Sequence, residues 1–342
     1  MAQARDMLVI DVPGLSVGDV QTLAATLPHL RELAGNFAAA LVPIASGSLM
    51  ARRATLATGL LPSLHLVAHD EASVLEVPAF WQRAAVQRPG RRAAYAGSCG
   101  PVGATAELHH RFEQGRPAWM PDTLRTPLLQ ALPAPVRDSG LADTAWAFAL
   151  QAMRAGVSLV WLECGVLLTC TPPHRAAALA ALDAALGPLL HAAGDRVVIL
   201  LAATATCTAT SMHPPVALKG TRTTHDHRLL HVHCGPQAAP QIAQQLRQEL
   251  AFSRVLSGAG RNELGLACPA AGDVIAELHP GWAFATGDDK LALAHAAPDS
   301  APQHLPVFLA RGLTLPKSIV GMCEVAWILQ HALAGLEYRD ES

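Results

Sequence analysis

Short apolar runs recur along the chain, and most lack the alternation of hydrophobic and polar residues that marks a half-exposed strand. An uninterrupted apolar run bounded by turn residues is typical of a strand covered on both faces, as in a parallel sheet. The pattern predicts strands at residues 7–12, 157–164, 196–203 and 227–234, and a terminal strand in "LPVFLARG" at 305–312.

Segments with helical periodicity lie between these runs. They predict helices at residues 17–34, 49–58, 142–155, 174–192 and 241–251. Alternation of strands and helices is typical of an α/β fold, so we expect a doubly wound, mostly parallel sheet flanked by helices.

Domain organisation follows from the segments that lack periodicity. We expect one domain over residues 1–342, with a cap-forming insertion at 64–141 and a second irregular insertion at 253–304. Turn-rich stretches such as "QRPGRR" and "GSCGPVG" support the first insertion.

Composition and charge narrow the function classes. Hydrophobic residues make up 51% of the chain and aromatic residues 4%, which indicates a large core of small aliphatic side chains. A formal net charge of −2 provides no positive field for a phosphate backbone, so nucleic acid is not an expected partner.

The first apolar run is too short for a membrane span or a signal-peptide core. We therefore expect a cytoplasmic protein with no membrane partner, which binds a small-molecule ligand or a protein. Seven scattered cysteines without CxxC spacing favour neither a disulfide framework nor a zinc ribbon.

Asp11 is the charged residue that ends the first apolar run, just before the turn "VPG". Ligands of open α/β sheets bind beyond the carboxyl ends of the strands, where this residue is expected. Two interpretations stay open: Asp11 caps the helix that begins near Ser16, or it holds a metal ion.

Several fragments, in order along almost the whole chain, resemble the alkaline phosphatase superfamily and its bacterial nucleotide pyrophosphatase/phosphodiesterase-like branch. They include "LVIDVPGL", "LPHLRELA", "ATLATGLLPSLH", "FWQRAAVQRPGRRAAY", "ADTAWAFALQAMRAGVSLVWL", "ALDAALGPLL", "HRLLHVH", "AAGDVIAELHPGWAFA" and "HLPVFLA". The resemblance implies an alkaline-phosphatase-like fold and a phosphoesterase site with two zinc-like ions, which activate the nucleophile and neutralise phosphoryl charge.

The residues that the resemblance assigns to this site are mostly replaced. Asp11 matches the first metal ligand, and His295, eleven residues before Pro306, matches the last. Leu49 stands at the nucleophile position. The family's DxxxH positions fall on Val166 and Cys170, and its DHG positions on Ala203, Thr204 and Ala205, so four ligands are missing. Two ligands do not hold zinc tightly, so no metal cofactor is expected.

Ser48 lies one residue before the expected nucleophile position, at the start of a predicted helix. It is either a shifted nucleophile, with His65 as its base, or the N-cap of that helix, with His65 structural. Arg52 and Arg53 follow on the same helix, where they either bind an anion or lie on an exposed face.

A histidine cluster at residues 225–233 offers an alternative metal site. Alternation along the predicted strand puts His227, His231 and His233 on one face, where they either bind a metal or are solvated.

Two hypotheses follow from these residues. The chain is a non-hydrolytic pseudoenzyme that binds a ligand or partner, or it is a repurposed, metal-independent enzyme that uses Asp11, Ser48, His65 or His295. In the first case a buried Asp11 needs a partner, and we expect His295 to lie within hydrogen-bonding reach of it.

Overall fold

The first three of the predicted strands are neighbours at the centre of one sheet. They are β1 (Met7–Asp11), β6 (Leu159–Glu163) and β7 (Val197–Leu201). All their residues are buried, and β1 pairs in parallel with both neighbours. The computed structural model describes residues 5–23, 26–68, 75, 77–97, 108–113, 116–117, 143–168, 172–212, 218, 221–284, 291–295, 297–313, 315 and 318–336.

The central sheet has nine strands in the order β16-β2-β15-β7-β1-β6-β3-β4-β5. The strands from β7 to β4 run parallel, while β15 runs antiparallel to both of its neighbours. The outer strands are β2 (Ala38–Val42), β3 (Ala93–Gly97), β4 (Leu108–Glu113), β5 (Arg116–Pro117), β15 (Val307–Arg311) and β16 (Ile319–Gly321).

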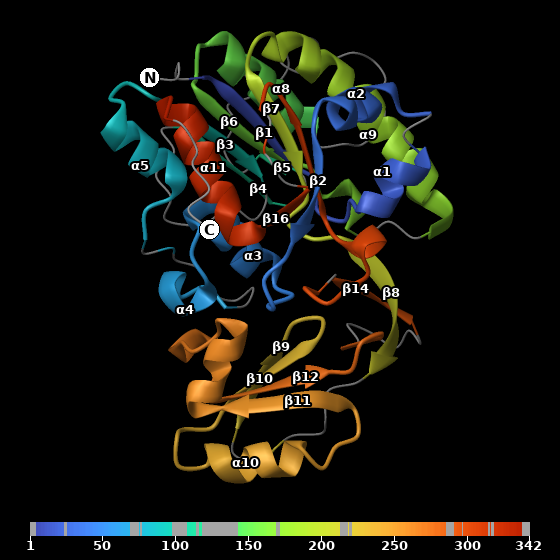
Figure 1. Cartoon of the computed structure of the whole chain (residues 1–342), viewed down its shortest axis with the longest axis vertical. Coiled ribbons are helices and arrows are strands. Elements are labelled where there is room, and N and C mark those ends of the chain that lie inside the picture. The colour runs from blue at the N-terminus through green and yellow to red at the C-terminus, as the bar shows by residue number, and fades with distance from the viewer. Residues whose placement is uncertain are drawn as a thin grey trace.

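Helices cover both faces of this sheet (Figure 1), which confirms the doubly wound α/β architecture. One face packs against α3 (Leu49–Thr58), α5 (Phe80–Gln87) and α11 (Met322–Ala334). The other packs against α1 (Val17–Leu23), α2 (Pro28–Asn36), α8 (Asp143–Arg154) and α9 (Pro172–Ala193).

The predicted helix at 17–34 is two helices, because the chain leaves α1 after Leu23 and starts again at Pro28, a favoured first-turn residue. In the described part of the chain, α9 is long and apolar enough to cross a membrane by length and composition. Its leucines pack into the core beneath the sheet, which accounts for that composition.

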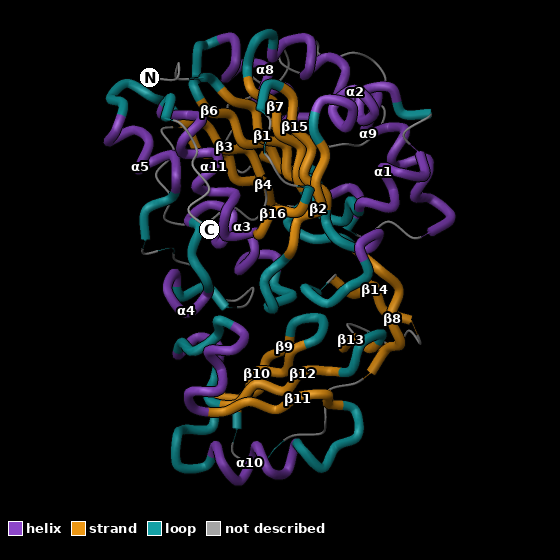
Figure 2. Tube along the Cα trace, viewed as in Figure 1, coloured by secondary structure: helices purple, strands orange, loops and turns teal. Residues whose placement is uncertain are grey.

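A smaller antiparallel unit lies at one end of the main sheet (Figure 2). Its sheet has the order β11-β12-β10-β9, and α10 packs on one face. The elements are β9 (Arg222–His225), β10 (Leu229–His233), α10 (Ala239–Leu246), β11 (Phe252–Ser257) and β12 (Val274–Leu278). A third sheet, β13-β8-β14, consists of β8 (Thr206–Met212), β13 (Trp282–Phe284) and β14 (Leu291–His295).

The structure differs from the predicted pattern in three regions. Residues 253–304, expected to be irregular, contain β11 to β14. The described parts of 64–141 include α5, β3 and β4, and both strands belong to the main sheet. The predicted strand at 227–234 starts later, at Leu229, because a turn over residues 226–228 precedes it.

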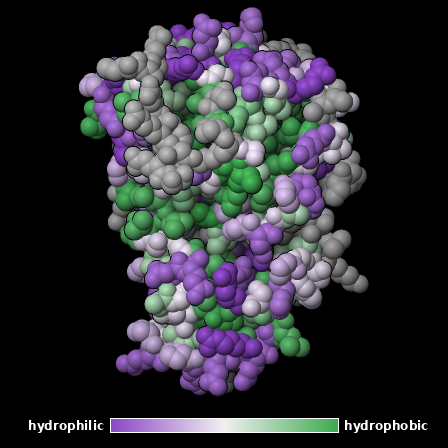
Figure 3. Space-filling model, in the orientation of Figure 1, coloured by the Kyte–Doolittle hydropathy of each residue, from purple (hydrophilic) through white to green (hydrophobic). Residues whose placement is uncertain are grey.

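Short helices complete the described connections. They are α4 (Pro62–His65) and the 3-10 turns Gly165–Leu167, Gly258–Leu264, Pro269–Ala271 and Pro302–His304. Leu61, Leu64 and Leu66 in and around α4 are partly exposed, where Figure 3 shows hydrophobic side chains at the level of α3 and α4.

The turn between β9 and β10 joins the small unit to the main one. Asp226 is buried, and its carboxylate accepts bonds from the Gly47 N–H at 2.8 Å and the Ser46 hydroxyl at 3.3 Å, just before α3. It also accepts the backbone N–H groups of Arg228 and Leu229 in its own turn. Burial raises the pKa of Asp226, but His231 and the N–H groups of Leu229 and Arg228 outweigh burial and hold that pKa well below its usual range.

We predict that Asp226→Asn lowers the free energy of unfolding by about 3 kcal/mol, because one oxygen becomes an amide donor that faces N–H donors. Asp299→Asn, at an exposed ion pair of the same interface, should cost less than about 1 kcal/mol. Equilibrium urea unfolding measures both, and equal losses would show that the buried turn does not hold the units together.

Candidate functional site

Two carboxylates lie side by side where the central parallel strands end. Asp11 closes β1 and Glu163 closes β6, and the two residues are paired in the register of these strands. Paired residues of neighbouring strands point to the same face, which here is the face covered by α3 and α11. Both side chains are buried, so the site must compensate two adjacent negative charges.

Arg53 of α3 provides this compensation. Its Nε donates to Asp11 Oδ2 at 2.8 Å, and another guanidinium nitrogen lies 3.0 Å from Glu163 Oε2. The three side chains are at most 3% exposed. The hydroxyl of Tyr95, on β3, donates to the second oxygen of Glu163. The guanidinium thus bridges the ends of β1 and β6.

Arg52 lies beside this bridge and is equally buried, with 1% exposure. Its guanidinium donates to the Ser46 carbonyl oxygen at 2.7 Å and to Thr204 Oγ1 at 2.8 Å, just after β7. Burial contradicts the expectation of an exposed helix face for both arginines. Their contacts are to acceptors of the protein itself, which does not support the expected anion-binding role.

Ser48 is the N-cap of α3, as one of the two interpretations predicts. Its hydroxyl oxygen accepts the Ala51 N–H at 3.1 Å, which satisfies a donor of the first helical turn. The side chain is 1% exposed. Leu49, at the nucleophile position implied by the resemblance, begins the helix.

His65 is buried at the end of α4 with both ring nitrogens occupied. Nδ1 accepts the Val67 N–H at 3.1 Å, so Nε2 carries the proton toward Thr55 Oγ1, 3.0 Å away. Burial lowers the pKa of His65 to about 4. This geometry fits the structural interpretation, since neither nitrogen faces Ser48.

The expected pair of Asp11 and His295 is wrong. Asp11 uses one oxygen for Arg53 and the other for the Ala203 N–H at 2.9 Å. His295 instead has Nδ1 2.5 Å from the Gly47 carbonyl oxygen and its ring centroid 3.7 Å from that of His227. Asp11 also does not cap α1, where Asp19 bonds Ser16. Arg53 is the better partner because it reaches both carboxylates at once.

His295 is held neutral. Burial, together with the nearby His227 and Arg52, lowers its pKa well below the usual value. A carbonyl oxygen can only accept, so Nδ1 carries the proton and Nε2 is an acceptor.

The histidine cluster does not share one strand face as predicted. His227 lies in the turn and stacks on His295, and His225 lies beside Phe284. His231 is fully buried, with Nδ1 3.0 Å from the Ala271 carbonyl oxygen and Nε2 3.7 Å from Asp226.

The described residues do not fit the two metal ions that the fold family implies. Among them, no group of three or more histidine, cysteine, aspartate and glutamate side chains is placed to hold a metal. Ala203 provides no ligand atom, and the Thr204 hydroxyl accepts from Arg52. The Val166 side chain and Cys170 lie outside the described residues.

Sequence reasoning missed Glu163, Tyr95 and Asp226. Glu163 had the same signal as Asp11, because it is the charged residue that ends an apolar run. Tyr95 and Asp226 had no comparable signal, since their roles depend on how distant segments pack.

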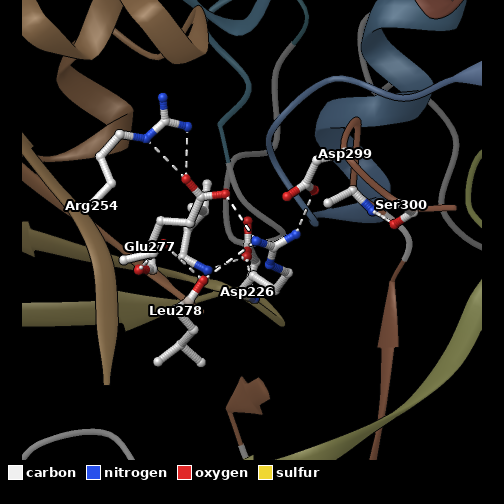
Figure 4. Close-up of polar contacts among 10 residues, drawn as sticks. Asp226, Arg254, Glu277, Leu278, Asp299 and Ser300 are labelled. Carbon is white, nitrogen blue, oxygen red and sulfur yellow. Dashed lines mark hydrogen bonds and ion pairs between the residues drawn. The ribbon is translucent and has the colours of Figure 1, made fainter. Parts of the chain in front are cut away.

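Two clefts lie near this buried network, and Arg228 lines both. The larger cleft, of about 840 Å³, includes residues of α1, α9, β8 and β13, together with His295. The smaller one, of about 690 Å³, is lined by residues at the end of β2 and after it, at the start of α11, and on β11 and β12. Between them Arg228 pairs with Asp299 at 3.0 Å and Glu277 at 3.3 Å, and Glu277 also pairs with Arg254 (Figure 4).

Solved structures with this fold include human ectonucleotide pyrophosphatase/phosphodiesterase 5, with a TM-score of 0.73 and 12% identity over 99% of this chain and 97% of that one. An inactive variant of the murine protein, in complex with AMP, gives 0.70 and 13% over 96% and 95%. Phosphonoacetate hydrolase from Sinorhizobium meliloti 1021, in complex with phosphonoformate, gives 0.69 and 12% over 97% and 96%.

These comparisons show an alkaline-phosphatase-like fold of the nucleotide pyrophosphatase/phosphodiesterase type, which confirms the resemblance seen in the sequence at the level of fold. No family model and no curated protein sequence matches the chain.

We predict that Arg53→Met lowers the free energy of unfolding by about 4 kcal/mol, because it leaves two buried carboxylates without their cation. Arg53→Lys should recover only part of the loss, since one ammonium does not reproduce the fork. The control Arg254→Met removes a pair whose arginine side chain is 40% exposed and should cost less than about 1 kcal/mol. Equilibrium urea denaturation measures the free energy of unfolding of each variant. If Arg53→Met loses as little as the control, the ion pairs of Arg53 do not stabilise the centre of the protein.

A second prediction concerns pH. The pKa of His65 is about 4 in the folded chain and about 6.5 when unfolded, so the unfolded state binds more protons between these values. Stability from the neutral ring is complete above about pH 6.5 and decreases as pH falls toward 4, by about 2 kcal/mol at pH 5.

Urea unfolding at pH 7.5 and pH 5 should therefore show a drop about 2 kcal/mol smaller in His65→Gln than in the wild type. The exposed His304 provides the control, and His304→Gln should keep the full drop. If the free energy of unfolding of His65→Gln falls as much between pH 7.5 and pH 5 as that of the wild type, His65 is not the source of this pH dependence.

Proposed function

We propose that this protein is a non-hydrolytic member of the phosphodiesterase-like fold that binds a small-molecule ligand. The Arg53 bridge carries the proposal: a guanidinium occupies the space between the Asp11 and Glu163 carboxylates at the strand ends. A divalent ion there would need these oxygens as ligands and would compete with a buried cation already hydrogen-bonded to both.

The nucleophile side of the site supports the same proposal. Phosphoryl transfer needs a hydroxyl activated by a base or a metal. The Ser48 oxygen accepts a helix-capping bond, and the ring nitrogens of His65 are used by Thr55 and Val67. Ser48 and His65, the nucleophile and base of the alternative enzyme, therefore serve separate local structures instead of one reacting centre.

Charge balance also favours binding without hydrolysis. The guanidinium of Arg53 lies between the two carboxylates of Asp11 and Glu163, while Arg52 donates to neutral oxygens of Ser46 and Thr204. In two-metal hydrolases the excess positive charge of the ions stabilises the phosphoryl transition state. One guanidinium between two carboxylates provides no such excess.

The proposal predicts far less than one zinc or manganese ion per chain by elemental analysis of protein purified without chelators. It also predicts that bis-p-nitrophenyl phosphate and p-nitrophenyl phosphate turn over at the buffer rate, with or without added zinc.

An active phosphodiesterase assayed in parallel verifies the substrates and the metal additions. Two bound metals per chain would refute the proposal. Turnover that disappears in Ser48→Ala and persists in the control Ser63→Ala, on α4, would instead establish a shifted nucleophile.

A further inference from the structure

The larger cleft lies next to the buried arginine network. His295 lines this cleft and is also close enough to Arg52 for that charge to lower its pKa. Its volume of about 840 Å³ is within the range of small-molecule pockets. Residues of α1 and α9 line one side, and residues of β8 and β13 line the other. The cleft is therefore large enough for a molecule of the size of a disaccharide or a nucleoside.

The acidic residues that line the cleft are each paired with an arginine. Asp19 accepts two bonds from Arg175, at 2.6 and 2.7 Å, and also binds Ser16. Asp299 is paired with Arg228, which also pairs with Glu277. Because these charges balance, the cleft offers an anionic ligand no excess positive charge.

Hydrogen-bonding residues of both kinds line the cleft. The hydroxyls of Thr206 and Ser300 accept bonds from Arg175 and from the Ala297 N–H, so each can donate its own hydrogen. Nε2 of His295 is an acceptor, because its other nitrogen is bonded to Gly47. This mixture of neutral donors and acceptors suits hydroxyl groups, which donate and accept at once.

An aromatic surface completes the cleft. Trp282, at the start of β13, lines it and is 41% exposed. An exposed indole provides a rigid apolar face on which a sugar ring or a nucleobase packs.

We propose that the larger cleft binds a neutral small molecule with neighbouring hydroxyl groups and one flat apolar face, as found in sugars and nucleosides. This inference rests on the proposed function. If the protein binds a ligand without hydrolysing it, the ligand needs a site other than the strand ends, where Arg53 bridges Asp11 and Glu163. The paired charges exclude a phosphorylated form as the preferred ligand.

The test is isothermal titration calorimetry of the full chain with maltose, glucose, adenosine and uridine, and with glucose 6-phosphate and AMP as charged counterparts. At least one neutral compound should bind with a Kd below about 1 mM, and its phosphorylated counterpart should bind more weakly. Comparison of the Kd values of maltose and glucose with those of adenosine and uridine shows whether the cleft prefers sugars or nucleosides.

Variants locate the site. Trp282→Ala should raise the Kd about tenfold, and Thr206→Val should raise it several-fold without changing the strand. Trp327→Ala, equally exposed at 40% but on α11, is the control and should leave the Kd unchanged. A thermal melt of each variant verifies that it is folded.

Three results would overturn the inference: no binding by any neutral compound at about 10 mM, tighter binding of the phosphorylated forms, or an unchanged Kd in Trp282→Ala. Hydrolysis of the p-nitrophenyl esters would refute the proposed function independently, whether or not the cleft binds sugars or nucleosides.

Discussion

A guanidinium buried between two carboxylates is the interaction on which the centre of this protein depends. The parallel register of β1 and β6 places Asp11 and Glu163 side by side, on a face covered by helices. Two such anions repel each other and lose hydration, so the arrangement is stable only with a cation between them. Arg53 fills that position, which also determines where α3 lies against the sheet.

The docking of the small unit follows from the same region of the chain. The loop that leads into α3 presents the Ser46 hydroxyl and the Gly47 N–H to Asp226. A Cβ at Gly47 would lie 3.0 Å from an Asp226 oxygen, so glycine permits this approach. The loop thus connects the arginine network on one side with the antiparallel sheet on the other.

The fold and the chemistry of the site therefore have separate origins. The chain shares its architecture with structures of a pyrophosphatase/phosphodiesterase and of a phosphonoacetate hydrolase. A fold provides the strand ends at which ligands collect, but the side chains placed there decide the reaction. Here those positions hold two carboxylates bridged by Arg53, while a cleft lined by polar and aromatic groups lies nearby.

Local patterns in the sequence were sufficient for the central strands and the span of α3, because burial on two faces and helical periodicity depend on nearby residues. They left Ser48 open between an N-cap and a shifted nucleophile, and the bond from the Ala51 N–H in the folded chain shows the cap. Fragment order also indicated the fold. The partner of Asp11 depended on tertiary structure, since Arg53 reaches Glu163 only after β1 and β6 pair and α3 packs across them. Likewise, the burial of both arginines results from long-range packing, which residue spacing along the chain does not encode.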